Sequence, residues 1–322
     1  MVTLIFRAKR EGMNSMETVF ENLDPLLPPH RNIVVPSSGG SIKSIIKNIL
    51  FTLKNKSQIN HITGEVHYVA IGTGRNTILT IHDIQSVQYG FPVKKFLLKV
   101  LWLWIPLMIC RKVTVISEFT KKELLQIAPF AGKKVVVIHN AFSPRVTHIK
   151  RTFNAKCPTI LHMGTNPNKN LERTIDAIKG IPCHLNVIGK LTESQKKILL
   201  TSGLSFENHY DVPYSSIIEY YENCDIVSFP STYEGFGVPI LEANAAGRPI
   251  IVGDIDVLHE VAGDAACFVN PLSVESIRSG FINIIDDTYY REALCIKGFE
   301  NIKRFSPELI ANQYSLLYES LY

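Results

Sequence analysis

The sequence has few cysteines and no long uninterrupted apolar run. Its six cysteines lie far apart and form no Cys-x-x-Cys pair, which argues against a disulfide framework or a zinc site and is typical of reduced thiols in an intracellular protein. The longest apolar stretch, 96–110, is interrupted by Lys99 and Pro106 and is too short to cross a bilayer. The apolar run before Arg7 is too brief for the core of a signal peptide. We therefore expect a cytoplasmic protein.

Acidic residues are scarce in the first half of the chain. Residues 1–150 hold 20 Lys and Arg against 8 Asp and Glu, a net charge of +12, whereas residues 151–322 hold 14 against 21, a net charge of −7. A basic half suggests an anionic partner, which could be a membrane surface, a phosphorylated acceptor or nucleic acid. The alternative is that these lysines are simply solvated on exposed helix faces.

The length and the pattern of apolar runs predict two α/β domains. A chain of 322 residues with 46% hydrophobic content is too long for one ordinary core. Short β-rich runs alternate with longer amphipathic stretches, as in βαβ units around parallel sheets. The candidate strands are 2–6, 32–35, 67–71, 77–81, 113–116 and 135–139 in a first series, and 159–163, 184–188, 204–206, 225–229, 249–252 and 266–269 in a second.

The two series are separated by a segment without a clean period, residues 140–156, which carries Pro144 and clustered basic residues. We place the domain hinge there and expect domains over 1–150 and 151–306. A final amphipathic helix over 307–322 could pack on either domain, including back on the first.

Two carboxylates flank a glycine turn within residues 231–251. Glu234 and Glu242 stand eight positions apart, directly after the candidate strand 225–229. Pro239 is placed where a helix would start, and Gly247 where it would end. The pattern predicts a loop carrying Glu234 at the carboxyl end of a strand, followed by a short helix carrying Glu242.

This arrangement suits a polyhydroxylated ligand. Gly235 and Gly237 would let backbone N–H groups approach a ligand closely. One carboxylate could accept two hydrogen bonds from a vicinal diol such as a ribose, and the other could hold the hydroxyls of a second sugar. Taken singly, Glu242 could instead be a favourable charge near a helix N-terminus, and Glu234 a solvated loop acid.

The stretch EGFGVPILE resembles the E-x7-E motif of retaining GT-B glycosyltransferases of family 4. The similarity extends through LHMGTNPNKNLERTIDAI, LNVIGKL, CDIVSFPSTYEGFGVPILEANAAGRPII, HEVAGDAACFVNP and RFS, in the order of that family's C-terminal domain, and covers nearly all of residues 158–306. In the first half, TIHD and VISEFTKKEL are also similar to the family. The resemblance implies a GT-B fold, in which two Rossmann-like doubly wound domains face a central cleft.

The resemblance also implies an activity. It indicates a metal-independent, retaining glycosyltransferase that moves a sugar from a nucleoside-diphosphate sugar to the hydroxyl of a saccharide or lipid-linked acceptor, in bacterial surface-polysaccharide or lipid-linked oligosaccharide assembly. The nucleotide sugar is a substrate, so no cofactor and no nucleic-acid partner are expected. The alternatives are a sugar-nucleotide epimerase or hydrolase of the same fold, and a non-catalytic subunit that binds a sugar nucleotide.

The resemblance assigns roles around the glycine turn. Glu242 would bind the ribose diol of the nucleotide. Glu234 would contact the donor sugar as a catalytic residue, together with the backbone at Gly235, Phe236 and Gly237.

A lysine in NPNKN completes the donor side of the implied site. Lys169 would neutralise the diphosphate as a catalytic residue, next to a helix N-terminus beginning near Asn170 that favours an anion; an exposed loop lysine is the alternative. Many family members carry an arginine where this chain has Thr165, as a second residue that binds the diphosphate. The resemblance does not say which residue has that role in this chain; Lys190 is a candidate.

His82 and Asp83, in TIHD at the end of a candidate strand, match a family position facing the sugar-transfer centre. The resemblance gives His82 a catalytic contact and Asp83 a donor-side position; a satisfied structural histidine is the alternative. Gly12 stands where the family's first strand leads into a glycine turn near the diphosphate. A competing turn carries Gly39 and Gly40. The place of Gly12 after the first strand favours Gly12, whereas the paired glycines of the family's turn favour Gly39 and Gly40.

Two further stretches have alternative interpretations. Asp254 to Asp256 has the D-x-D form that holds a divalent cation in other glycosyltransferases, but it lies where the family has an ordinary loop, so we expect no metal.

Trp102 and Trp104, with Lys94, Lys95 and Lys99, could enter a membrane interface or could be core. With the basic first half, the first alternative suggests peripheral association with an anionic membrane at its inner face.

Overall fold

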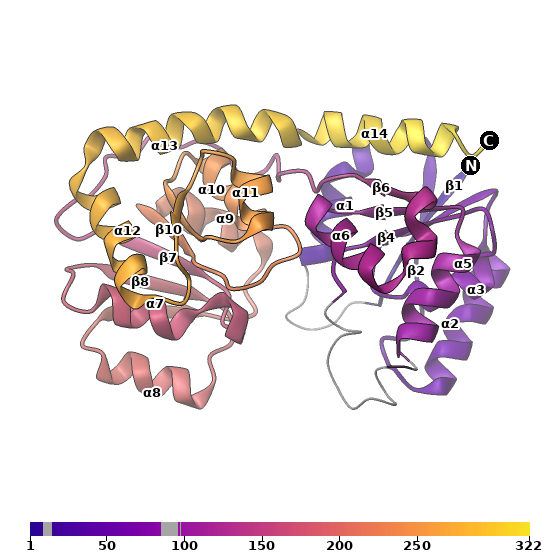
Figure 1. Cartoon of the computed structure of the whole chain (residues 1–322), viewed down its shortest axis with the longest axis horizontal. Coiled ribbons are helices and arrows are strands. Elements are labelled where there is room, and N and C mark those ends of the chain that lie inside the picture. The colour runs from indigo at the N-terminus through magenta and orange to yellow at the C-terminus, as the bar shows by residue number, and fades with distance from the viewer. Residues whose placement is uncertain (9–14, 85–95, 97) are drawn as a thin grey trace. The chain divides into compact units, whose positions relative to one another are not determined.

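The structure, a computed structural model, describes residues 1–8, 15–84, 96 and 98–322. The chain divides into two compact units, one of Met1–Ala141 with Pro307–Tyr322 and one of Phe142–Ser306 (Figure 1). Each unit holds one six-stranded sheet in which neighbouring strands run parallel. The expected α/β class is confirmed.

The sheet of the first unit has the strand order β2-β1-β3-β4-β5-β6. Its strands are β1 (Val2–Phe6), β2 (His30–Val34), β3 (Ile59–Ile62), β4 (Thr77–Ile81), β5 (Lys112–Val115) and β6 (Val135–Val137). The main helices of this unit are α1 (Ser15–Leu23), α2 (Ile42–Asn55), α3 (Ala70–Thr73), α5 (Ile105–Ile109), α6 (Glu118–Ile127) and α14 (Pro307–Glu319).

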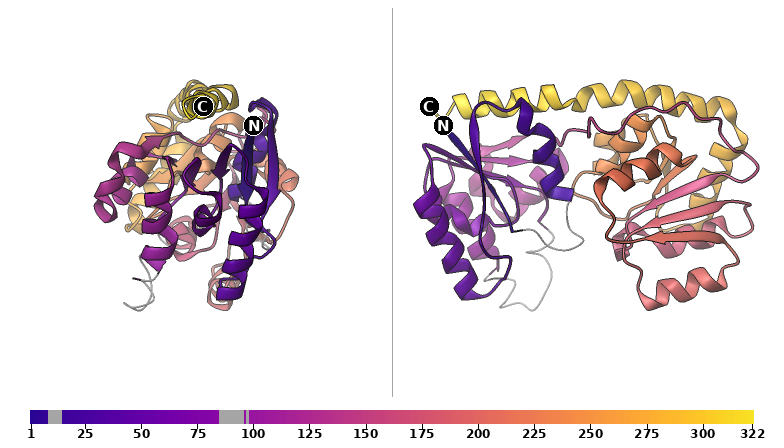
Figure 2. Two further views of the ribbon diagram at one scale, coloured as in Figure 1. Left: turned by 90° about the vertical axis from the view of Figure 1, so that its right-hand side faces the viewer. Right: turned by 180° about the vertical axis from the view of Figure 1, so that it is seen from behind.

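Two apolar clusters cover the two faces of this sheet. Because side chains alternate along a strand, Leu4 of β1 joins one cluster and Ile5 joins the other. The first cluster is completed by α1 and by α14, which lie on the same side of the sheet (Figure 2). The C-terminal helix is also fixed by a buried hydrogen bond of 2.7 Å between the Tyr318 hydroxyl and Nδ1 of His61.

One predicted strand of the first unit is wrong. Residues 67–71 are helical, whereas β3 is formed by Ile59–Ile62. The β3 sequence includes Asn60 and His61, which look unsuited to a buried strand. Asn60 is hydrogen-bonded locally to Ser57, and His61 is hydrogen-bonded to the distant Thr80 and Tyr318. Residues 67–71 have β-like composition, yet Gly72 brings the following helix so close to α2 that a Cβ there would lie 2.4 Å from the Ile49 carbonyl oxygen. Tertiary packing therefore overrides local propensity.

Of the two interpretations of Trp102 and Trp104, the structure supports packing against the core. Both residues are partly buried against the apolar cluster of the first unit that contains Ile5. Their indole N–H groups donate to the carbonyl oxygens of Glu65 and Ile127, at 3.2 and 3.3 Å. Lys94 and Lys95 lie outside the described residues. None of the helices in the described part of the chain is long and apolar enough to cross a membrane.

The sheet of the second unit has the strand order β12-β11-β10-β7-β8-β9. Its strands are β7 (Thr159–Met163), β8 (His184–Ile188), β9 (Ser205–His209), β10 (Ile226–Phe229), β11 (Ile250–Gly253) and β12 (Cys267–Val269). Its helices are α7 (Leu171–Ile178), α8 (Glu193–Thr201), α9 (Tyr214–Asn223), α10 (Val238–Ala246), α11 (Asp256–Ala262), α12 (Val274–Asp286) and α13 (Thr288–Asn301). The strand order reverses between β7 and β10, which is where open parallel sheets bind ligands.

The boundary between the units lies after Ala141 rather than after residue 150. Residues 142–150 are held by the second unit. The Phe142 N–H donates to the Phe305 carbonyl oxygen at 3.1 Å, and the Arg248 guanidinium donates to the Ile149 carbonyl oxygen at 2.9 Å. Residues 142–150 have no helix or strand period, so their contacts with the second unit could not be predicted from the sequence.

Candidate functional site

Two loops meet at the switch point of the second unit's sheet, one after β7 and one after β10. The amide of Asn168 donates to the Tyr233 carbonyl oxygen at 2.9 Å, and the Thr232 N–H donates to the Asn168 carbonyl oxygen at 2.9 Å. Asn170 adopts a left-handed backbone conformation, with φ of 65°, and its buried amide donates to the Pro230 carbonyl oxygen. These bonds hold the two loops as one surface.

Lys169 and Glu234 form an ion pair across the two loops. The Lys169 Nζ lies 2.6 Å from Oε1 of Glu234, and the two side chains are 21% and 12% exposed. The same ammonium lies 4.6 Å from the centroid of the Phe229 ring. The lysine stem passes over Gly164, where a Cβ would lie 2.8 Å from Lys169 Cγ. Two residues that the resemblance assigned to the donor diphosphate and the donor sugar are thus in direct contact.

A buried histidine near this pair, His162, is uncharged at neutral pH. His162 on β7 is fully buried, and burial, followed by the nearby charge of Lys169, lowers its pKa to about 3. One of its ring nitrogens approaches the Ser228 hydroxyl at 3.2 Å. The positive charge at this site therefore comes from Lys169 and not from the imidazole below it.

Glu242 is a buried carboxylate on α10. It is 5% exposed, and its Oε1 accepts a hydrogen bond of 2.6 Å from the Tyr214 hydroxyl. Burial raises the pKa of Glu242, and the hydroxyls of Tyr214 and Tyr221 oppose that rise. Burial also raises the pKa of Tyr214, followed by the charge of Glu242, so the phenol remains a donor. No motif points to Tyr214 in the sequence, because it stands 28 positions before its partner.

The glycine turn sets the start of α10. Gly237 precedes the helix with φ of 110°, and a Cβ there would lie 2.8 Å from Leu258 Cδ2. The Phe236 ring is buried and packs edge-on against Phe305, with centroids 5.8 Å apart. The Phe236 side chain is therefore part of the core of the second unit. Gly247 ends the helix in a left-handed conformation.

Thr165, which stands where many family members carry an arginine, lies beside Lys190. The Thr165 hydroxyl donates to the Lys190 carbonyl oxygen at 2.7 Å. The Lys190 side chain is exposed, and its Nζ lies 5.5 Å from the centroid of the Tyr210 ring. Lys190 thus lies on the loop next to the β7 loop, at the same carboxyl edge of the sheet.

His82 and Asp83 lie in the first unit, directly after β4. His82 is buried, its ring Nε2–H donates to the Thr63 carbonyl oxygen at 2.8 Å, and burial lowers its pKa. Arg7 and Glu65, 3.3 Å apart, follow β1 and β3 at the same edge, and both act electrostatically on His82. No sequence motif points to Arg7 and Glu65, because only the strand order β1-β3-β4 brings these segments together.

The remaining candidates are the glycine turns of the first unit and the D-x-D stretch of the second. Gly12 lies outside the described residues, whereas Gly39 and Gly40 lead into Ser41, whose hydroxyl caps α2. Asp254 accepts a hydrogen bond from His259 at 2.6 Å. Among the residues that the structure describes, no three His, Cys, Asp or Glu side chains gather as a metal ion would require.

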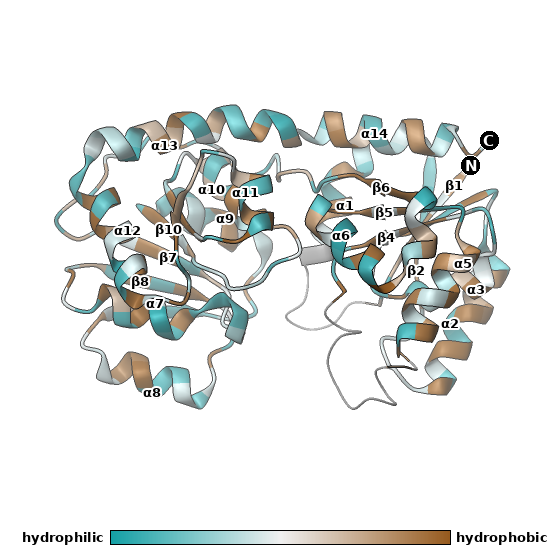
Figure 3. Cartoon of the chain, viewed as in Figure 1, coloured by the Kyte–Doolittle hydropathy of each residue, from teal (hydrophilic) through white to brown (hydrophobic). Residues whose placement is uncertain are grey.

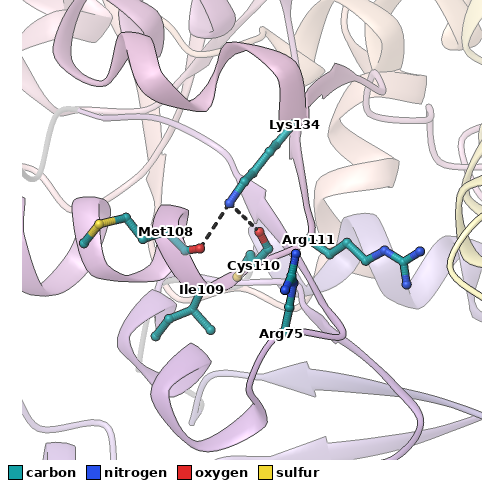
Figure 4. Close-up of a pocket in the computed structure, with 6 residues that line it drawn as sticks. All are labelled: Arg75, Met108, Ile109, Cys110, Arg111 and Lys134. Atoms are coloured by element: carbon teal, nitrogen blue, oxygen red, sulfur yellow. Dashed lines mark hydrogen bonds between the residues drawn. The ribbon is translucent and has the colours of Figure 1, made fainter.

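A pocket also occurs in the first unit, but it lies at the opposite edge of its sheet. Arg75 and Arg111 stand just before β4 and β5, and the pocket also includes Met108 and Lys134 (Figure 4). The Lys134 ammonium donates to three carbonyl oxygens at the end of α5, at 3.0 to 3.1 Å. This lysine therefore has a structural role, as a cap of α5.

Comparison with known proteins identifies related chains. Residues 146–300 match the family model of glycosyl transferases group 1. The chain is 26% identical over 235 residues to the O-antigen chain mannosyltransferase B of Escherichia coli, covering 64% of this chain and 60% of that protein. It is 28% identical over 221 residues to the O-antigen chain mannosyltransferase RfbU of Salmonella typhimurium, covering 65% and 61%. The chain thus spans about 60% of the length of these curated relatives.

Solved structures share the fold. The Anabaena protein HepE, in complex with UDP and glucose, has a TM-score of 0.78 at 15% identity, covering 99% of this chain and 100% of that one. WaaG, a glycosyltransferase involved in lipopolysaccharide biosynthesis, has a TM-score of 0.74 at 11% identity, covering 99% of each chain. The chain has the GT-B fold of these glycosyltransferases, and its residues 146–300 match the model of the glycosyl transferases group 1 family.

Proposed function

We propose that the chain is a retaining glycosyltransferase that moves a sugar from a nucleoside-diphosphate sugar to an acceptor hydroxyl, in surface-polysaccharide or lipid-linked oligosaccharide assembly. The observation that carries this proposal is the Lys169–Glu234 ion pair at the switch point of the sheet. A cation suited to a diphosphate and an acceptor suited to sugar hydroxyls stand within one hydrogen bond of each other, which supports the proposal.

Donor binding would exchange the partners of this pair. The diphosphate takes the Lys169 ammonium, which frees the Glu234 carboxylate to accept hydrogen bonds from the donor sugar. Helix α7 begins two residues after Lys169 and α10 four residues after Glu234, and helix N-termini favour an anion. The pair therefore keeps both charges compensated until the substrate replaces each partner.

Glu242 would hold the ribose. Tyr214 occupies Oε1 and the Tyr221 hydroxyl also acts on the carboxylate, so the lone pairs that remain would accept hydrogen bonds from the vicinal diol. This requires the ionised carboxylate, although burial raises the pKa of Glu242.

The transfer step needs no protein nucleophile in this proposal. The bond between the anomeric carbon and the phosphate oxygen breaks as the acceptor oxygen attacks from the same face, and the departing diphosphate takes the acceptor proton. Lys169 stabilises the growing phosphate charge. In the first unit, His82 with Asp83 would contribute to the sugar-transfer centre. Neither a metal ion nor a cofactor takes part in this scheme.

The relatives and neighbours suggest which donors to test. The similar O-antigen proteins are named mannosyltransferases, and HepE was solved with UDP and glucose. Calorimetric titration of the purified chain with UDP-, GDP- and ADP-sugars, including glucosyl and mannosyl forms, identifies the donor. Products formed with and without acceptor then separate transfer from hydrolysis or epimerisation; donor binding without turnover in either condition would indicate a non-catalytic subunit.

The acceptor and the location are also proposals. We propose a saccharide or lipid-linked acceptor and a cytoplasmic protein that associates peripherally with an anionic membrane. The net charge of +12 on residues 1–150, from 20 basic and 8 acidic residues, supports this association.

A further inference from the structure

Helix α2 exposes an apolar stripe to solvent. Ile42, Ile46, Leu50 and Leu53 are 75%, 51%, 50% and 47% exposed. Their spacing of four, four and three positions puts them on one face of the helix. Figure 3 shows the apolar residues along α2 in brown. A soluble helix normally turns such a face toward its own core, so this stripe needs another partner.

The other side of α2 is the one that holds it to the first unit, and much of this contact is polar. Asn48 is fully buried, and its amide donates to the Ser37 carbonyl oxygen at 2.9 Å and to the Tyr68 hydroxyl at 2.8 Å. Thr52 is also fully buried on this side, where Gly72 of α3 allows close approach of the two helices. These contacts fix the orientation of α2, so the helix cannot rotate its apolar stripe inward.

A row of lysines lies directly beside the stripe. Lys43, Lys47 and Lys54 each follow one residue of the stripe by one position, and all three are exposed. Residues 42–55 include no Asp or Glu. The face thus combines apolar side chains, which can enter an acyl boundary, with cations that attract anionic headgroups. A second copy of the chain would bring two like-charged rows together, which disfavours self-association.

We infer that the stripe and lysine row of α2 form the surface by which the first unit docks on an anionic phospholipid membrane. This inference rests on the membrane association proposed above and assigns it to a surface; it is independent of the transfer chemistry. It also replaces the stretch containing Trp102 and Trp104 as the candidate membrane surface, because those indoles are engaged in the core.

Cosedimentation with vesicles tests this inference. The full chain is mixed with vesicles of phosphatidylcholine alone or of phosphatidylcholine with phosphatidylglycerol, at low and at high salt. We expect binding to the anionic vesicles, weakened by salt. The variant Ile46→Ser/Leu50→Ser should bind at least about tenfold more weakly, since it lacks two apolar side chains whose transfer from water to the membrane favours binding. The variant Lys43→Gln/Lys47→Gln should lose most of the salt dependence.

Matched controls come from α8 in the second unit. Leu200 is 75% exposed, so Leu200→Ser removes an exposed apolar side chain, and Lys196→Gln/Lys197→Gln removes two charges; both should bind vesicles like the unaltered chain. Circular dichroism and nucleotide titration of every variant show that folding and the donor site are intact, so failure of this inference is distinct from failure of the proposed function.

Three results would overturn the inference. The first is no binding of the unaltered chain to anionic vesicles at low salt. The second is equal binding by the α2 variants. The third is a concentration-dependent dimer in sedimentation velocity that Ile46→Ser/Leu50→Ser abolishes, which would assign the stripe to contact between copies of the chain.

Discussion

Lys169 and Glu234 stand 65 positions apart in the sequence and 2.6 Å apart in the structure. If they act as an exchangeable pair, replacing either one should lower kcat for transfer more than it raises KM. We expect Lys169→Ala to lower kcat by about 10²- to 10³-fold, the usual cost of removing one group that stabilises charge in a transition state. In the double variant Lys169→Ala/Glu234→Gln, the loss should be smaller than the product of the single losses.

The control for this prediction is Lys179→Ala. Lys179 pairs with Asp176 at the same distance of 2.6 Å, but on the surface of α7 and beyond its end, where both side chains are about half exposed. Steady-state kinetics should give unchanged constants for this variant. Full activity of Lys169→Ala, or strictly multiplicative losses, would contradict the exchange.

Glu242 should make nucleotide affinity depend on pH. Because burial raises its pKa, the carboxyl becomes protonated at a higher pH than an exposed glutamate, and nucleotide affinity should fall as pH decreases through that raised pKa. Glu242→Gln should bind nucleotide about 10- to 100-fold more weakly at neutral pH, since a hydrogen bond to a charged group contributes about 1.5–3 kcal/mol, and should lack this pH dependence. Titration calorimetry at several pH values measures both effects.

The same residue links function to stability. A raised carboxyl pKa means that folding favours the protonated form, so the associated stability is present at low pH and is lost as pH rises through the folded pKa. Glu242→Gln should therefore increase Tm at neutral pH while weakening nucleotide binding. A lower Tm would show that the buried charge is compensated more fully than the contact with Tyr214 implies.

The start of α10 depends on Gly237. Gly237→Ala would impose both an unfavourable positive φ and a contact with Leu258, and should lower the free energy of unfolding by about 1–3 kcal/mol. Gly203→Ala separates the two causes, because Gly203 has φ of 74° but open space around a Cβ. Thermal unfolding should show the larger loss for Gly237→Ala; equal losses would mean that the Leu258 contact costs nothing.

Helices and strands are predicted well from the sequence where their side chains are mostly apolar. Strands β7, β10, β11 and β12 and the short helix between Pro239 and Gly247 follow from apolar runs and from proline and glycine signals. Strand β3 was missed because Asn60 and His61 are buried polar residues, and a partner of His61 stands 257 positions away on α14. Tyr214 was missed for the same reason, since its pairing with Glu242 exists only after folding.

Across both units, buried histidines should make the chain sensitive to acid. Burial lowers the pKa of His61 and of His162 to about 3, and that of His67 to about 4. In the unfolded chain these imidazoles titrate near 6.5, so the unfolded state binds more protons below that pH and stability falls on acidification. Urea unfolding should give a lower free energy of unfolding at pH 5 than at pH 7, and His61→Gln should reduce the difference. Equal stability at both pH values would contradict the neutral burial of these rings.

Binding of the diphosphate and ribose of a sugar nucleotide by the loops after β7 and β10 is central to the proposed function. Calorimetric titration with nucleoside diphosphates tests it without knowledge of the acceptor. We predict one-to-one binding of one nucleotide, weakened at least about tenfold by Lys169→Ala and by Glu242→Gln and unchanged by Lys179→Ala. Absence of binding by every nucleotide, or equal affinity in all of these variants, would contradict the claim.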